Sequence, residues 1–209
     1  MPATARLLTR AVAAAAWLAV AAGCSNDPVS SDPAPLPYTV SGTLRNVSGA
    51  TVPADARVVL VWSGDDGTGD YSYVWGSGPV DAASGRFTIT LDAAPPAAAT
   101  LAGSAGQRLG VGIPVLVPAG AVREGRVDDP RAFNGALGAA GQYAVIYREG
   151  ALPAGDDGAP WTGIREGYNV GRGVPARAGQ VFDGFEAVGA STVELVVDAL
   201  RNIRFVNWT

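Results

Sequence analysis

Short runs in which apolar and polar residues alternate recur along this chain from residue 38 onward. The clearest run is Arg86–Leu91, in which Phe87, Ile89 and Leu91 are separated by single threonines. A period of two places the apolar side chains on one face of an extended strand. The 28 glycines and 15 prolines of the chain break helix interiors and favour turns. The chain is therefore expected to be all-β, with many short strands.

The spacing of these runs predicts an antiparallel β-sandwich of about 7–9 strands with long Gly-rich loops. Nearly continuous apolarity predicts a central strand at Ala56–Trp62. Pro114 is expected at an edge or a bend, because proline donates no ladder hydrogen bond. The expected strands are Tyr38–Leu44, Ala56–Trp62, Tyr71–Trp75, Arg86–Leu91, Leu109–Val117, Gln142–Arg148, Tyr168–Val170, Thr192–Asp198 and Ile203–Trp208.

Residues 1–23 have the layout of a cleaved secretory signal. Two arginines precede an uninterrupted apolar run at Ala11–Ala22, which is too short to span a bilayer. The run ends in small residues and Gly23-Cys24, which resembles the lipobox of bacterial lipoproteins. The resemblance implies that the signal is cut before Cys24, the single cysteine, and that its thiol carries a diacylglycerol and acyl lipid such as palmitate. Stable anchoring needs two or more such chains.

Residues 24–37 are expected to be the lipidated cysteine and a flexible tether, because a Ser-, Asn-, Asp- and Pro-rich segment cannot bury a core. Residues 38–209 then form one β-sandwich domain. Removing residues 1–23 takes away two arginines, so the formal charge of −4 becomes −4 − 2 = −6. An acidic, lysine-free chain has no electrostatic footprint for nucleic acid and no basic patch for an anionic bilayer. Membrane contact is therefore expected through the lipid alone.

The residue types that are missing exclude several classes of enzyme. The chain has no histidine and one cysteine, which excludes Ser-His-Asp catalysis, His-ligated or thiolate zinc, and an internal disulfide. Glycoside hydrolysis needs only two carboxylates. The glutamates Glu149, Glu166, Glu186 and Glu194 therefore leave a glycosidase open, although nothing in the sequence pairs them. The chain is expected not to be an enzyme and to need no cofactor other than its lipid.

Part of the domain resembles a known family of accessory modules. Val40–Leu44, Val58–Leu60 and Gly85–Leu91, followed by Pro95-Pro96, are similar to a prealbumin-like, carboxypeptidase-regulatory-like β-sandwich. The similarity covers about a third of the chain and rests on strand spacing and a Gly-x-Phe turn. It implies a module on the bacterial surface that carries no catalytic residues of its own.

Aromatic residues are the candidates for a ligand-binding surface. Exposed rings can stack on sugars, and long loops in compact domains are often functional. Such rings serve more often as core packing, so a sugar site competes with a structural role. The candidate residues are Tyr71, Tyr73 and Trp75 on an expected hairpin, and Trp161 and Tyr168 in a long Gly-rich region.

An acidic turn offers a candidate calcium site. Asp65, Asp66 and Asp70 lie in a glycine-rich stretch, and Ca²⁺ prefers several hard oxygen ligands from such loops. The EF-hand spacing is not met, because the twelfth position counted from Asp65 is Gly76. The competing interpretation is a solvated hairpin turn.

Together these features predict an exported, lipid-anchored protein of the bacterial cell envelope. Its β domain is expected to be structural or adhesive and to contact an unidentified envelope protein or a glycan. A carbohydrate-binding module is the alternative, and a carboxylate-dependent glycosidase the third possibility. In a Gram-negative cell the outer membrane is favoured, because Ser25 follows Cys24 where an aspartate would mark retention at the inner membrane.

Overall fold

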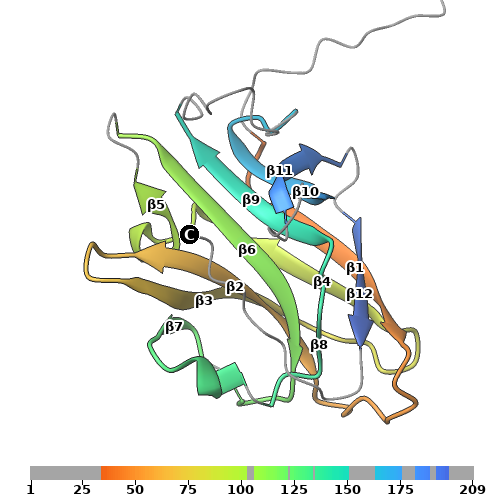
Figure 1. Ribbon diagram of the computed structural model, residues 1–209. Helices are drawn as coiled ribbons and strands as arrows, with labels where there is room; N and C mark the ends of the chain where they lie inside the picture. The colour runs from red at the N-terminus through yellow and green to blue at the C-terminus, as the bar shows by residue number, and fades with distance from the viewer. Residues whose placement is uncertain are drawn as a thin grey trace, which may run out of the picture. The chain divides into compact units, whose positions relative to one another are not determined.

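The computed structural model describes residues 34–102, 106–121, 123–133, 135–150, 163–175, 182–188 and 192–197, all within one compact unit. Their regular structure is nearly all β-strand, apart from two short 3₁₀ helices (Figure 1), which confirms the all-β prediction. The elements are β1 (Tyr38–Asn46), β2 (Arg57–Asp65), β3 (Asp70–Pro79), β4 (Arg86–Leu91), η1 (Ala97–Ala99), β5 (Leu101–Ala102), β6 (Arg108–Val117), β7 (Gly125–Val127), η2 (Pro130–Phe133), β8 (Gly138–Ala139), β9 (Tyr143–Glu149), β10 (Gly167–Pro175), β11 (Phe182–Ala187) and β12 (Thr192–Val197).

The strands form one mixed sheet. Its longest path runs β11-β10-β9-β6-β8-β12-β1-β4, and β2 branches from β6 to carry β3 and β7. β1 pairs with β12 in parallel, with Ser41 opposite Thr192, so the prediction of a purely antiparallel sheet is wrong. Tight hairpins join only antiparallel neighbours. The parallel pair is possible because most of the chain lies between these two strands.

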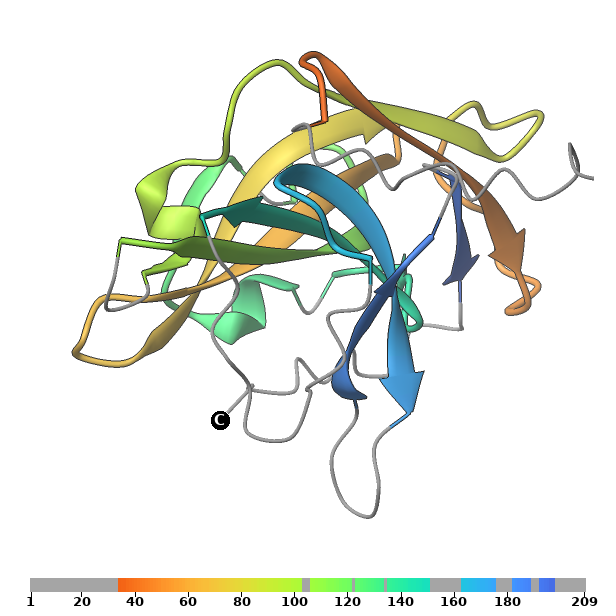
Figure 2. The same cartoon turned by 90° about the horizontal axis from the view of Figure 1, so that it is seen from above.

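The sheet curls until β4 lies against β3 (Figures 1 and 2). An isolated bridge joins Val80 to Phe87 where the two strands approach. Gly78 of β3 packs directly on the backbone of β4, since a Cβ at this position would lie 1.9 Å from the carbonyl oxygen of Thr88. A glycine is therefore required at position 78 for β3 and β4 to approach each other this closely.

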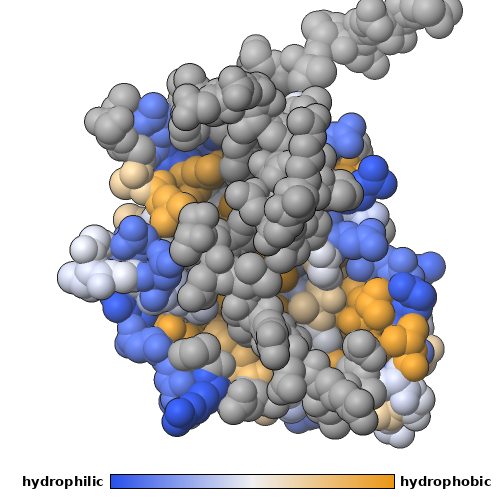
Figure 3. All heavy atoms as spheres, in the orientation of Figure 1, coloured by the Kyte–Doolittle hydropathy of each residue, from blue (hydrophilic) through white to orange (hydrophobic). Residues whose placement is uncertain are grey.

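Three hydrophobic clusters cover the faces of the sheet. The largest fills the inside of the curl and includes Leu60, Ile89 and Leu195. A second lies on the other face of β2 and β6, under Phe133 of η2. A third lies on the outer face of β9 and includes Ile146. On the described part of the face in Figure 3, apolar residues reach the surface in separate places among hydrophilic ones.

β2 is the central strand that its continuous apolarity predicts. It lies between β3 and β6, and both of its faces are buried. Val58 and Leu60 belong to the cluster inside the curl, whereas Val59 and Val61 belong to the cluster on the opposite face. Each of these side chains contributes about 1.5–3 kcal/mol by leaving water. β2 therefore ties two of the three clusters together.

β6 carries Pro114 in the interior of the sheet, so of the expected edge or bend the edge is wrong, and the residue lies at a break in pairing. Along one side β6 pairs with β2. Along the other it pairs with β9 through residues 108–112 and with β8 at residues 115–116. Pro114 falls between these two partners, and its carbonyl accepts a hydrogen bond from Ala140 at 2.9 Å. The backbone N–H that proline lacks would point to the same side of β6 as this carbonyl. Neither β8 nor β9 needs a hydrogen-bond donor at that point.

The β domain already includes residue 34, within the stretch that the sequence assigns to the tether. Ala34 is 7% exposed, and its N–H donates to the carbonyl oxygen of Glu166 at 3.2 Å. A Cβ on Gly167 would lie 2.9 Å from the Ala34 nitrogen, so the two backbones touch. The chain therefore enters the domain at a fixed point beside the start of β10.

Three of the predicted strands have different outcomes in the structure. The strand expected at Arg86–Leu91 coincides with β4, and its alternate residues are buried and exposed in turn. The short strand expected at Tyr168–Val170 is part of the longer β10. The strand expected at Ile203–Trp208 lies outside the described residues.

Candidate functional site

Five aromatic side chains meet inside the curl, around Tyr168 of β10. The Tyr168 ring stacks with Tyr38, at a centroid distance of 5.4 Å, and with Trp75, at 6.4 Å. Tyr147 and Trp62 approach the same ring at an angle, at 5.0 and 6.4 Å. Pairs of this geometry contribute about 0.5–1.5 kcal/mol each beyond the area that they bury. We call these five residues the aromatic cluster.

Hydrogen bonds fix the two most deeply buried members of the aromatic cluster. Tyr168 is 1% exposed and its hydroxyl donates to the carbonyl of Ala93 at 2.7 Å. Trp62 is fully buried, and its Nε1 donates to the carbonyl of Trp75 at 2.8 Å. Burial raises the pKa of the Tyr168 hydroxyl far above its ordinary value, so this group stays a donor. Tyr168 offers no free ring face to a ligand.

Tyr71, Tyr73 and Trp75 occupy alternate positions of β3 and therefore share one of its faces. Each is half-buried. Trp75 packs into the aromatic cluster, and the guanidinium of Arg126 lies 4.0 Å from the centroid of the Tyr71 ring. Of the predicted ligand-binding residues, the structure thus brings Trp75 and Tyr168 together as packing partners. Tyr71 and Tyr73 keep partly exposed surfaces.

The acidic turn between β2 and β3 is tied to β7. Asp66 binds Arg126 at 2.5 Å and accepts hydrogen bonds from both the N–H and the hydroxyl of Thr68. The hydrogen bond from the Thr68 hydroxyl, followed by that from Arg126, holds the pKa of Asp66 well below its ordinary value. Asp65 accepts from a backbone N–H of the turn and faces Asp70 across the ladder. Within the described ranges, no three acidic, histidine or cysteine side chains gather closely enough to hold a metal ion.

Arg126 is the cation that organises this turn. It also binds Asp128, the residue that follows β7, so two carboxylates and the Tyr71 ring surround one guanidinium. The two carboxylates raise the pKa of Arg126 further. Of the three candidate calcium ligands, Asp66 is therefore engaged by a guanidinium together with Asp128, which is not one of the three.

Arg108 fixes the segment that covers one end of the aromatic cluster. Its guanidinium donates to the carbonyl of Pro95 at 2.6 Å and to the hydroxyl of Thr100 at 3.2 Å, and pairs with Glu149 at 3.1 Å. The same group lies 5.8 Å from the centroid of the Tyr147 ring. No sequence pattern indicates this role, because the partners come from segments that the fold alone brings together.

The four glutamates considered for glycoside hydrolysis do not gather at one described cleft. Glu149 pairs with Arg108, and Glu166 accepts from the N–H of Gly150 at 3.3 Å. In the antiparallel register of β9 and β10, Glu149 and Glu166 lie opposite each other, one position beyond the pair of Arg148 and Gly167. The other two lie apart, Glu194 paired with Arg45 at 2.8 Å and Glu186 in an open pocket of ≈ 280 Å³ with Tyr143 and Arg172.

Two predicted site residues, Cys24 and Trp161, lie outside the described residues. None of the helical segments that the structure describes has the length and apolarity needed to cross a bilayer. No family model, curated protein or solved structure matches this chain. The functional argument therefore rests on the residues themselves.

Proposed function

We propose that this chain is a lipid-anchored protein of the bacterial cell envelope, whose β domain has a non-catalytic, structural or adhesive role. The observation that carries the proposal is Gly23-Cys24 at the end of an apolar run, with Cys24 the single cysteine of the chain. The absence of histidine from the whole sequence supports a role without histidine-activated nucleophiles or imidazole acid–base chemistry. The partner is an envelope protein, and no nucleic acid is involved.

The arrangement of polar side chains supports a non-catalytic role. A glycosidase needs an acid and a second carboxylate facing one bond. Glu149 and Glu194 are engaged by arginines, and Glu166 by a backbone N–H. We also propose that the curled sheet is a β-sandwich of the prealbumin-like type. The cluster inside the curl supports this, since it joins side chains of β2 and β6 to those of β1 and β4.

Metabolic labelling tests the lipid anchor. Cells that express the full chain are fed an alkyne analogue of palmitate, and the labelled protein is detected after coupling to a dye. The wild-type chain is expected to carry the label and to fractionate with membranes. The Cys24→Ala chain should carry no label and leave the membrane fraction. An unlabelled wild-type chain in the soluble fraction would contradict the proposal.

A carbohydrate-binding module is the second candidate. The observation that favours it is that Tyr71 and Tyr73, at alternate positions of β3, keep partly exposed surfaces. Flat rings at alternate strand positions can stack on successive sugars. A glycan array probed with the Cys24→Ala chain tests it, with binding expected to fall in Tyr73→Ala and to persist in Tyr143→Ala, which lies outside this face. A silent array would favour the structural role.

A further inference from the structure

The point at which the chain enters the β domain is fixed by backbone contacts. Ala34 is held against Glu166 and Gly167 by the 3.2 Å hydrogen bond and by the close approach described above. Gly167 has φ +80° and so adopts a backbone conformation that side chains disfavour. Any anchor that precedes Ala34 is therefore attached beside the start of β10.

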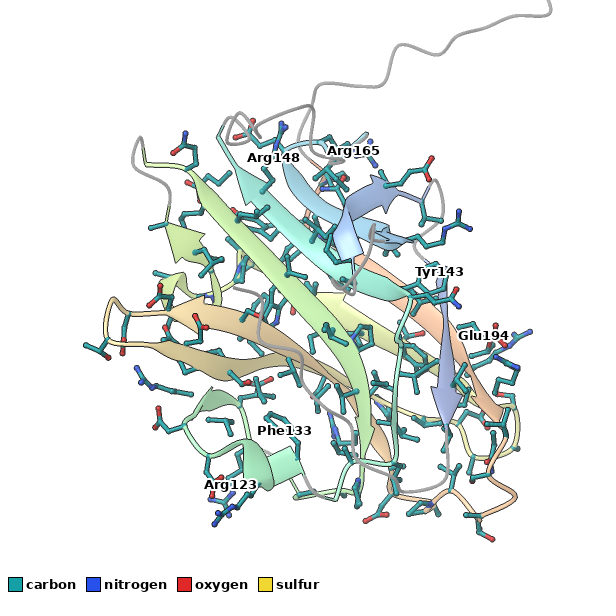
Figure 4. The ribbon with its side chains drawn as sticks, viewed as in Figure 1. Arg123, Phe133, Tyr143, Arg148, Arg165 and Glu194 are labelled. Carbon is teal, nitrogen blue, oxygen red and sulfur yellow. The ribbon has the colours of Figure 1, made fainter. Side chains whose placement is uncertain are left out.

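This entry point lies at one end of the strands. The start of β1 at Tyr38, the end of β9 and the start of β10 meet here, and Arg148 and Arg165 mark the same end in Figure 4. β1 then runs nine residues away from it, a length of ~30 Å. At the far end, Leu44 bonds to Gly85 of the β3–β4 turn. We call these the entry end and the far end.

The proposed lipid attachment is too near to Ala34 to reach the far end freely. Nine residues, 25–33, separate Cys24 from Ala34, so ten residue steps join the two and span at most ~36 Å when fully extended. To place the far end on the bilayer, the tether would have to run along the whole length of β1 at nearly full extension. Such a state has very little conformational entropy compared with states in which the entry end faces the lipid.

The side chains at the entry end are compatible with a lipid headgroup layer. Leu36 is 50% exposed there, and the arginines Arg148 and Arg165 lie at the same end. Their charge is opposed at that end by Glu166, so the surface is mixed, in a chain whose formal charge is −4. An exposed leucine at the same end as the exposed Arg165 suits the boundary between headgroups and acyl chains.

We propose that the entry end faces the bilayer surface, so that the β3–β4 turn and the β1–β2 loop point away from it. This inference rests on the proposed lipidation of Cys24. The aromatic face of β3 would then be approached from the side of the domain.

Energy transfer from single cysteines to labelled lipids tests the orientation. The chain has one cysteine, whose thiol is blocked when it is lipidated, so one introduced cysteine accepts a donor dye alone. Leu36→Cys labels the entry end, and Val47→Cys labels the far end. The two native side chains are matched, being 50% and 53% exposed. The lipidated variants are reconstituted into phosphatidylethanolamine and phosphatidylglycerol vesicles that contain an acceptor-labelled lipid.

Transfer is expected to be about twofold more efficient from Leu36→Cys than from Val47→Cys, because ~30 Å of strand separates the two ends. Ala83→Cys, in the turn at the far end, should match Val47→Cys. Equal or reversed efficiencies in chains that float with the vesicles would overturn the orientation and leave the anchor intact. If the wild-type chain and both variants fail to float with the vesicles, the anchor and the orientation fall together.

Discussion

At the scale of single residues, the Trp62 ring packs directly on two glycines of β6. The indole lies over Gly112, where a Cβ would be 2.7 Å from Trp62 Cε2, and over Gly110, where it would be 3.1 Å from the ring. Gly112 is also the cross-strand partner of Trp62. A glycine at this position gives the ring a flat surface, whereas its neighbours on the strand are branched apolar residues.

Gly112→Ala is expected to lower the free energy of unfolding by about 1–3 kcal/mol, because the added methyl group overpacks a closed site. Urea denaturation followed by tryptophan fluorescence measures the loss. Gly141→Ala is the matched control, because no atom lies within 4 Å of a Cβ built there. Equal stability of the two variants would show that the Trp62 ring shifts at little cost.

The sequence shows that Gly110 and Gly112 alternate within an apolar strand, but it does not reveal why. Their partner is Trp62, 50 positions away from Gly112 along the chain (112 − 62 = 50). The same limit applies to the predicted binding residues. A glycine-rich stretch predicts that its tyrosine lies at the surface. Only the fold shows that Tyr168 lies at the centre of the aromatic cluster.

At the scale of elements, the segment of residues 92–100 depends on Arg108. Three polar groups of this segment accept hydrogen bonds from side chains of other strands. Tyr168 donates to the carbonyl of Ala93, and Arg108 donates to the carbonyl of Pro95 and to the hydroxyl of Thr100. The segment has little regular structure of its own beyond η1. Its position over the aromatic cluster is therefore set by side chains from β6 and β10.

Arg108→Met is expected to loosen this segment and to cost about 1–3 kcal/mol, because it leaves a carbonyl and a hydroxyl without their donor. Hydrogen exchange at the amides of residues 97–102 should accelerate. Arg45→Met is the control, since its pair with Glu194 is more than half exposed on both sides and such pairs contribute about 0–1 kcal/mol. If the two variants exchange alike in this segment, Arg108 does not hold it.

Periodicity predicted elements well where one strand faces one core. β4 alternates strictly, and its bounds coincide with those of the predicted strand. The nearly continuous apolarity of Ala56–Trp62 predicts the central position of β2, which spans Arg57–Asp65. Pro114 shows the limit of such reasoning. Proline is excluded from a continuous ladder, but β6 changes partners at that residue, and partner changes leave no trace in a local pattern. The parallel pairing of β12 with β1 could not be predicted for the same reason, because the choice of a pairing partner leaves no trace in a local pattern.

At the scale of the whole molecule, the stability of the protein depends on tyrosines at alkaline pH. The chain has no lysine, so tyrosine dominates side-chain titration between about pH 9 and 11. Burial raises the pKa of Tyr38, Tyr147 and Tyr168 in the folded state. An unfolded chain releases these protons near pH 10, whereas the folded chain retains them.

Folding stability is therefore expected to be complete below about pH 10 and to fall as the pH rises further, by up to ~1.4 kcal/mol per pH unit for the buried Tyr168 and by less for the more exposed Tyr38 and Tyr147. Urea denaturation at about pH 8 and about pH 11 measures the change. Tyr168→Phe should lose less stability between the two conditions than the wild type. Tyr143→Phe, which lies outside the aromatic cluster, is the control. A loss in Tyr168→Phe as large as in the wild type would contradict the assignment.

The ladder between β1 and β12 also sets when the protein can finish folding. Ser41 and Thr192 are neighbours in the sheet although 192 − 41 = 151 positions separate them. Pairings of such high contact order fold on millisecond to second timescales, and this one can form only after residues 192–197 have been synthesised. Until then one side of β1 is an open edge that other extended chains can join. The nascent protein is therefore expected to be most prone to aggregation in the interval before β12 arrives.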